Sequence, residues 1–186
     1  PMDRCLMRVG AFASRLLPGV VVPAIRTRLR AESRAVILEA EDRSLTRYLE
    51  MRKESGMRCN LNQLGEAVLG EEEAANRLEA LIGLLGRPDV NYVSVKISAI
   101  FSQINLVARE HSLATIKERL RPLYRIALRE DKFVNLDMEE YDDLDLTVQA
   151  FRELLEEEAF HALPAGIVLQ DYLPDYRVRT GKLNPE

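Results

Sequence analysis

Four polar side chains stand at or just past the ends of four apolar segments: Glu66, Lys96, Asp137 and Gln170. They comprise an amine, two carboxylates and an amide. An ammonium group beside carboxylates can bind a charged substrate, and a lysine can also form a Schiff base with a carbonyl compound. An amide can orient a ligand, because it both donates and accepts hydrogen bonds. This set predicts a binding or catalytic site and leaves the reaction open.

Each of these residues also has a purely structural interpretation. Lys96 could extend to solvent from a strand end, as long cationic side chains do. Asp137 could begin a turn, and Gln170 could be a core amide with its hydrogen bonds satisfied. If Lys96 instead lies inside the protein, its ammonium needs a carboxylate partner, because an unpaired buried charge is costly. Asp137 or Glu139 could supply that carboxylate.

The segments that carry these residues alternate with amphipathic ones. Apolar, β-branched runs predict strands, and apolar residues at helical spacing predict helices between them. The predicted strands cover residues 58–64, 91–100, 132–138 and 165–173. The predicted helices between them cover residues 71–87, 112–130 and 145–160. This alternation predicts βα units and therefore a parallel sheet.

The length of each βα unit fits a (β/α)8 barrel, in which ~250 residues are shared among eight units. A doubly wound open sheet is also compatible with this alternation. However, the segment QLGEAVLGEEEA after the first strand lacks the G-x-G-x-x-G fingerprint of dinucleotide-binding folds. We therefore predict an α/β fold: a partial (β/α)8 barrel of four units over residues 58–186, preceded by an N-terminal helical arm over residues 1–57.

The alternation of side chains along a strand places polar residues on one face. Two such sets are Ser94, Lys96 and Ser98 in the second strand, and Asn135, Asp137 and Glu139 in the third. A strand that is buried on both sides should be apolar on both. In a barrel, polar groups late in a strand belong to the interior near the carboxyl ends of the strands, where active sites of this fold are built.

The composition narrows the class of protein. The chain has 186 residues, of which 47% are hydrophobic and 30% charged, which is ordinary for a soluble globular domain. Its net charge of −4 gives no indication of nucleic-acid binding. Residues 1–35 nevertheless carry a local net charge of +5, which fits either a solvated helix face or contact with anionic lipid or an acidic partner.

Several kinds of site are unlikely on residue counts alone. Two cysteines without metal-binding spacing predict neither a metal site nor a disulfide framework, and they fit a reducing compartment. Two histidines make histidine-based triads and His-rich metal sites poor candidates. No apolar run reaches the ~18 residues that a membrane span needs. We therefore expect a cytoplasmic protein.

The strand motifs resemble those of one family. The segments QLGEAVLGEEEA, YVSVKISAI, VNLDMEEYDDLDLT and IVLQDYLPD are similar to the first four strand motifs of FAD-dependent proline dehydrogenases. The similarity is closest to the catalytic domain of the bifunctional proline utilisation A type. It covers residues 58–176, with the motifs in the family's order and spacing. Four ordered motifs together are specific, although any one alone would not be.

The resemblance implies a flavoprotein of proline catabolism. The implied reaction is the oxidation of L-proline to 1-pyrroline-5-carboxylate, with FAD at the barrel mouth and a quinone at the membrane as electron acceptor. Lys96 then helps to hold the substrate carboxylate, and Asp137 lines the site beside the flavin. Gln170 hydrogen-bonds the flavin ring. Glu66 closes over the substrate by pairing with an arginine. A peripheral contact with the inner face of the membrane is also implied.

The family's later motifs are not found in this sequence. They include an arginine and a lysine around the flavin and paired arginines that bind the substrate carboxylate. Four units cannot close a barrel, so we expect that this chain alone neither holds FAD well nor oxidises proline. The alternative is a non-catalytic half-barrel that self-associates, or binds a partner, through its open sheet edges. An unrelated enzyme that uses Lys96 as a Schiff-base nucleophile is a third interpretation.

Overall fold

The structure is a computed structural model that describes residues 17–33, 42–63, 68–138 and 140–170. The chain forms two compact units, Pro1–Tyr48 and Leu49–Glu186. In the described residues, no helix is both long and apolar enough to cross a membrane. The division into an arm of residues 1–57 and a barrel segment of residues 58–186 stays a prediction.

Within the described residues, two helices precede the sheet along the chain: α2 (Pro18–Ser33) and α3 (Asp42–Glu54). None of the residues of α2 is buried. Helix α3 ends in a Schellman motif: the N–H of Gly56 donates to the Lys53 carbonyl at 2.9 Å, and that of Met57 to the Arg52 carbonyl at 2.9 Å. Gly56 has a φ of 72°, where glycine is favoured because it has no Cβ. Gly56 therefore terminates the helix.

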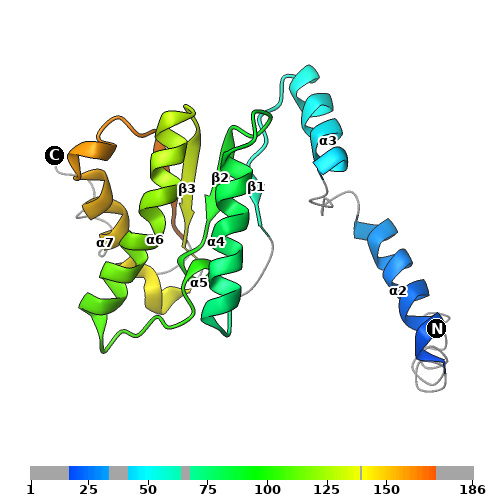
Figure 1. Ribbon diagram of the computed structural model, residues 1–186, viewed down its shortest axis with the longest axis horizontal. Coiled ribbons are helices and arrows are strands. Elements are labelled where there is room, and N and C mark those ends of the chain that lie inside the picture. Colours follow the sequence, from blue (N-terminus) through cyan, green and yellow to red (C-terminus); the bar gives the residue numbers. More distant parts are fainter. Residues whose placement is uncertain (1–16, 34–41, 64–67, 139, 171–186) are drawn as a thin grey trace. The chain divides into compact units, whose positions relative to one another are not determined.

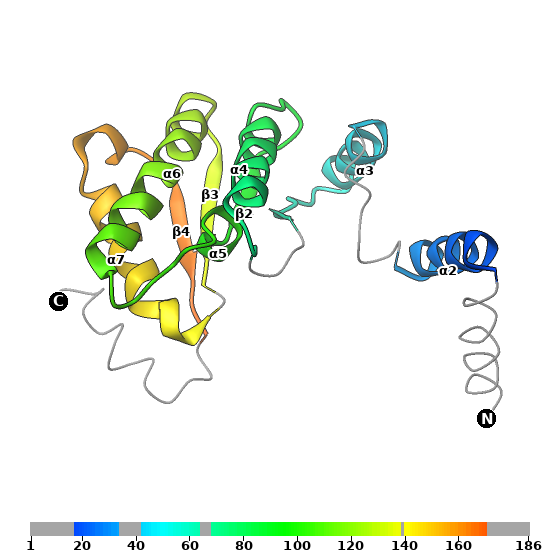
Figure 2. The ribbon, with the colours of Figure 1, turned by 60° about the horizontal axis from the view of Figure 1, so that its bottom comes forward.

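A four-stranded sheet forms the centre of the second unit (Figures 1 and 2). Its strands are β1 (Leu61–Asn62), β2 (Tyr92–Val95), β3 (Phe133–Asp137) and β4 (Ala165–Val168). Neighbouring strands are parallel, and their order in the sheet is β1-β2-β3-β4. The predicted parallel sheet is confirmed.

The helices decide between the two predicted architectures. Helices α4 (Glu71–Leu85), α6 (Arg109–Arg129) and α7 (Leu144–Leu155) all lie on one side of the sheet (Figures 1 and 2). Sequential strands with every crossover on the same side are typical of a barrel segment. A doubly wound sheet would reverse its strand order and place helices on both faces. The observed arrangement is therefore that of a partial (β/α)8 barrel.

The core lies between the sheet and these helices. The alternate strand residues Val93, Val95, Val134 and Leu136 are at most 1% exposed and form the sheet's contribution to the core. The helices contribute a set of fully buried side chains: Leu81, Leu85, Ile116, Leu120, Leu123 and Leu154. One side of β2 and of β3 is thereby committed to packing, and the other side carries the polar residues Ser94 and Asn135.

The second strand is shorter than the sequence predicts. It ends at Val95, and residues Ile97–Ile100 form the short helix α5. The predicted strand over residues 91–100 is therefore wrong in its second half. Its β-branched residues suggested a strand, but the spacing of Ile97 and Ile100 also suits one helical turn, and both are buried. Ser98 belongs to α5, so the prediction that it shares a strand face with Lys96 is wrong.

Helix α6 also differs from its prediction. It begins at Arg109 rather than at residue 112, where the predicted helix over residues 112–130 starts, and it continues through Pro122 to Arg129. Ser112 is fully buried inside the helix, where its hydroxyl accepts a hydrogen bond from the Asn105 N–H at 2.9 Å. The side-chain oxygen of Asn105 in turn accepts the N–H of Val107 at 2.9 Å. Asn105, in the preceding loop, therefore orders the approach to the helix.

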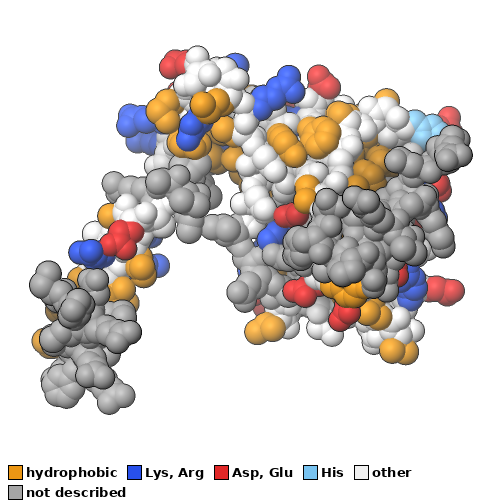
Figure 3. Space-filling view, turned by 180° about the vertical axis from the view of Figure 1, so that it is seen from behind, with side chains coloured by type: hydrophobic (Ala, Val, Ile, Leu, Met, Phe, Trp, Pro, Cys, Tyr) orange, Lys and Arg blue, Asp and Glu red, His pale blue; other side chains and the backbone are white. Residues whose placement is uncertain are grey.

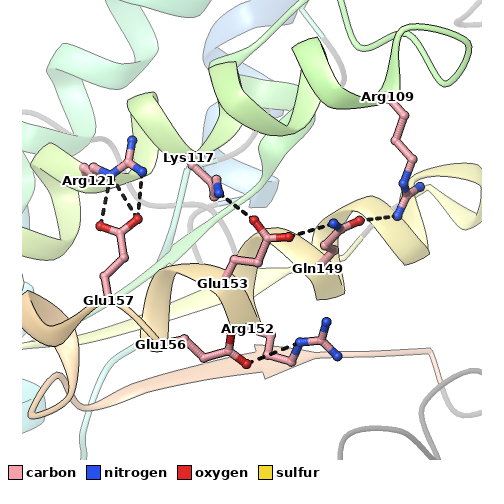
Figure 4. A network of polar contacts seen from close by, with 8 residues as sticks. All are labelled: Arg109, Lys117, Arg121, Gln149, Arg152, Glu153, Glu156 and Glu157. Carbon is pink, nitrogen blue, oxygen red and sulfur yellow. Dashed lines mark hydrogen bonds and ion pairs between the residues drawn. The ribbon is translucent and has the colours of Figure 1, made fainter.

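Ion pairs join α6 to α7 on the outer surface (Figure 4). Lys117 Nζ lies 2.5 Å from Glu153 Oε2, and Arg121 Nη2 lies 2.7 Å from Glu157 Oε1. The hydrogen bond with Lys117, followed by one with Gln149, lowers the pKa of Glu153 below its ordinary value. The hydrogen bond with Arg121 likewise lowers the pKa of Glu157.

These lowered pKa values predict acid sensitivity of the α6–α7 contact. Because each folded-state pKa lies below the ordinary value of 4.5, the pairs stabilise the folded state above that pH and lose this contribution as the pH falls further. Each pair is partly exposed, so we expect about 0.5 kcal/mol from each. Urea unfolding at about pH 6 and about pH 3 should show a smaller loss of stability for Glu157→Gln than for the native chain. An equal loss in both proteins would contradict this assignment.

Candidate active site

A row of small polar residues crosses the sheet on the face opposite the helices. Asn62 is paired with Ser94, Ser94 with Asn135, and Asn135 with Gly166, one position on each of the four strands. Side chains at paired positions of a parallel sheet point to the same face. This row, the inner polar row, lies on the side that becomes the interior of a barrel.

Hydrogen bonds connect the inner polar row through Ser94. The side-chain amide of Asn60 donates to Ser94 Oγ at 2.8 Å, and that of Asn135 donates to the same oxygen at 3.3 Å. Ser94 and Asn135 are each only 3% exposed, so these hydrogen bonds satisfy groups that have little access to water. The network ties the residue that precedes β1 to β2 and β3, directly below the predicted site.

Lys96 and Asp137 lie one layer further toward the carboxyl ends of the strands. Val95 is paired with Leu136, and Lys96 and Asp137 are the next residues of these two neighbouring strands. Both are partly exposed. Asn62 on β1 donates a hydrogen bond to Asp137 Oδ2 at 3.2 Å, which restrains the carboxylate from the other side of β2. An amine and a carboxylate are thus placed at corresponding positions of one sheet edge.

Two aromatic rings form the layer below the polar row. The ring of Tyr92 meets that of Phe133 edge-to-face, with 4.9 Å between their centroids. Gly166 makes room for this layer, since a Cβ at that position would lie 2.9 Å from Phe133 Cζ and 3.1 Å from Asn135 Oδ1. The absence of a side chain on β4 therefore allows both the aromatic pair and Asn135 to occupy the inner face.

Of the other predicted site residues, the structure describes Gln170 but neither Glu66 nor Glu139. Gln170 follows β4 by two residues, at the same edge of the sheet, and is partly exposed. It lies beyond β4, which ends at Val168, so the predicted strand over residues 165–173 is wrong at residues 169 and 170. Glu66 and Glu139 lie outside the described residues. Ser94 and Asn135 were expected on the inner face, and the pairing places them there.

Acidic residues follow Asp137 at the mouth of the sheet. The loop after β3 leads through a short 3-10 helix, η1 (Tyr141–Asp143), into α7. Burial, followed by repulsion from Glu140 and Asp142, raises the pKa of Asp143 above its ordinary value. Figure 3 views the molecule from the side opposite to that of Figure 1, and hydrophobic, acidic and basic side chains are all exposed on this face.

Sequence reasoning missed two members of this region, Asn60 and Asn62. The signal was present, because both asparagines occur at alternate positions of RCNLNQL and therefore share a face of the predicted strand. Two described residues of that strand suffice to place Asn62 opposite Ser94.

The comparison with known families decides what this arrangement belongs to. Residues 45–184 match the sequence profile of the family described as proline dehydrogenase. The chain belongs to the proline dehydrogenase family. The resemblance inferred from the four strand motifs is thereby confirmed, and the matched region includes every predicted site residue.

Solved structures of proline dehydrogenase relatives have the same fold. Proline Utilization A (PutA) from Corynebacterium freiburgense is 48% identical, with a TM-score of 0.78 over 84% of this chain. PutA from Bdellovibrio bacteriovorus, inactivated by N-propargylglycine, is 30% identical, with a TM-score of 0.80 over 89% of this chain. PutA from Bradyrhizobium japonicum, at 21% identity and a TM-score of 0.65 over 91% of this chain, supports the fold alone.

The match covers only part of these relatives. The chain spans 16% of the Corynebacterium freiburgense protein, 20% of the Bdellovibrio bacteriovorus protein and 19% of the Bradyrhizobium japonicum protein. No match was found among curated proteins.

Proposed function

We propose that this chain supplies part of the active site of a flavin-dependent proline dehydrogenase, which oxidises L-proline to 1-pyrroline-5-carboxylate. One observation carries the proposal: Lys96 and Asp137 follow paired positions on neighbouring parallel strands, at the sheet edge where barrels of this kind build their sites. Family membership supplies the reaction class.

The residues at this edge fit FAD as the cofactor. A flavin ring needs an apolar surface to lie against and polar groups for its edge. Val168 on β4 is 46% exposed at the position paired with Asp137, and the Gln170 amide follows it. Gln170 would hydrogen-bond the ring, and Asp137 would line the site beside it. The chemistry that FAD supplies when bound is acceptance of a hydride from the carbon next to the proline nitrogen.

The chain's own residues would bind and orient the substrate. The Lys96 ammonium would pair with the proline carboxylate, since a charge-assisted hydrogen bond holds a carboxylate more firmly than a neutral donor does. Asp137, restrained by Asn62, would help to hold the Lys96 side chain in place. Glu66 would close over bound proline by pairing with an arginine, and closure would exclude water.

The electrons would pass to a quinone. A quinone dissolves in the bilayer, so the enzyme would work in the cytoplasm and touch the inner face of the membrane peripherally. The local charge of +5 in residues 1–35 supports such a contact, because basic segments are attracted to anionic lipid.

A chimera tests the activity. Residues 45–184 replace the matching segment of PutA from Corynebacterium freiburgense, whose 48% identity favours correct folding. We expect the chimera to bind FAD and to bleach its absorbance when proline is added. N-propargylglycine, which inactivates the Bdellovibrio bacteriovorus relative, should inactivate it too.

Two outcomes would contradict the proposal. One is a folded chimera with bound FAD that proline does not reduce. The other is a 186-residue chain that forms a discrete dimer by sedimentation while its chimera stays inactive, which would favour self-association through the sheet edges.

A further inference from the structure

A buried turn of helix directly follows Lys96. Lys96 is the N-cap of α5, and all four residues of that helix are buried. A helix of one turn is not stable by itself, because helix nucleation is unfavourable. Its conformation must therefore be imposed by neighbouring elements, and whatever holds α5 also holds the backbone of Lys96.

Glu71, the first residue of α4, binds the chain at the end of α5. Its Oε1 accepts the N–H of Ser102 at 3.0 Å and the Ser102 hydroxyl at 2.5 Å. Its other oxygen forms an ion pair with Arg119 of α6. Both carboxylate oxygens are thus engaged, and the hydrogen bond from Ser102, followed by that from Arg119, lowers the pKa of Glu71.

Arg119 completes the contact from the other side. One nitrogen of its guanidinium binds Glu71, and another donates to the carbonyl of Ile100, the last residue of α5. The same group stacks on Phe101, with its central carbon 4.8 Å from the ring centroid. A planar fork of donors can serve these partners together, whereas a lysine presents a single point of charge. We call Glu71, Ser102 and Arg119 the α5 clamp.

Helix α5 is also attached to the segment that carries Glu66. The N–H of Val68 donates to the carbonyl of Ser98 inside α5 at 3.2 Å, and Val68 is only 4% exposed. Within α5, the N–H of Ala99 donates to the carbonyl of Lys96 at 3.2 Å. One short helix therefore connects Lys96 to Val68, which follows Glu66 by two residues in the sequence.

We propose that the α5 clamp consists of positioning residues, which fix α5 and through it set the places of Lys96 and Val68. The value of the clamp for catalysis rests on the proposed function, because only that function gives Lys96 and Glu66 a common substrate.

Hydrogen exchange on the 186-residue chain tests this proposal. Glu71→Ala removes the centre of the clamp, and Glu153→Ala is a matched control that removes a glutamate paired with another α6 cation, Lys117. We expect Glu71→Ala to speed exchange of the Val68 and Ala99 amides about tenfold, because loss of a charge-assisted hydrogen bond favours local opening. The control should leave both rates unchanged.

A second readout follows Lys96 itself. Reductive methylation with a ¹³C label gives each accessible lysine its own NMR signal. The Lys96 signal should shift in Glu71→Ala, whereas that of exposed Lys53 should not. Arg119→Lys should behave like Glu71→Ala, because it keeps the charge and loses the fork. Glu71→Gln, which retains acceptors for Ser102, should restore part of the protection.

A comparison of exchange rates at individual amides can also overturn the proposal. If Glu71→Ala speeds exchange no more at Val68 and Ala99 than at Leu136 in β3, the clamp contributes only to general stability. If that variant does not fold, Ser102→Ala removes a single hydroxyl and is judged by the same ratio. Neither readout uses proline or flavin, so a negative result here is distinct from failure of the chimera.

Discussion

Replacement of Lys96 by methionine is expected to lower kcat/KM for proline about 100-fold in the chimera. Methionine keeps most of the length and the apolar stem and removes only the charged head. Loss of one partner of a desolvated charge pair costs about 2–5 kcal/mol, which corresponds to at least about 30-fold. Most of the effect should appear in KM, because the ammonium binds a carboxylate that is equally charged before and during the reaction.

A matched substitution separates this effect from general damage. Lys53→Met makes the same chemical change on the exposed surface of α3 and should leave kcat/KM within about twofold. The FAD content of both variants, measured from flavin absorbance, shows whether the cofactor site is intact. A Lys96→Met chimera with full FAD content and an unchanged KM would remove Lys96 from the site.

The sequence predicts the order of elements because the period of the hydrophobic pattern differs between strands and helices. The apolar residues Val134 and Leu136 of β3 alternate with the polar Asn135 and Asp137, and such a period of two is typical of a strand. The same rule fails after Val95. There a polar–apolar alternation continues in sequence while the chain turns into α5, since one helical turn also buries Ile97 and Ile100. A segment this short contains too few repeats of the hydrophobic pattern to distinguish a strand from a helix.

The parts of the site that follow from the alternation of side chains along a strand can be predicted from the sequence, whereas contacts between long side chains cannot. The alternation places Ser94 and Asn135 on the inner face, and the observed pairing agrees. The ion pair of Glu71 with Arg119 joins residues 48 positions apart through two flexible side chains. No periodicity specifies such a contact, because the rotamers that form it are chosen by packing between helices. The positions of Lys96 and Asp137 were therefore predictable, and their supports were not.

Glycine-to-alanine substitutions at two positions should have opposite effects on stability. Gly166→Ala places a methyl group 2.9 Å from Phe133 Cζ and 3.1 Å from Asn135 Oδ1, so the ring and the amide must both move. Overpacking of this kind costs about 1–3 kcal/mol. Phe133 has little freedom to yield, because its ring already meets Tyr92 edge-to-face. Movement of Asn135 would also weaken its hydrogen bond to Ser94, directly below the predicted site.

Gly83→Ala is the matched control for that substitution. Gly83 lies inside α4, and a Cβ there would meet no other atom within 4 Å. Alanine should stabilise the helix by about 0.5–1 kcal/mol, because it loses less backbone entropy on folding than glycine. Urea unfolding of the two variants should therefore move the midpoint in opposite directions. If Gly166→Ala were as stable as the native chain, the inner face would have space for a side chain on β4, and the packed layer of Phe133 and Asn135 could not be the floor of the site.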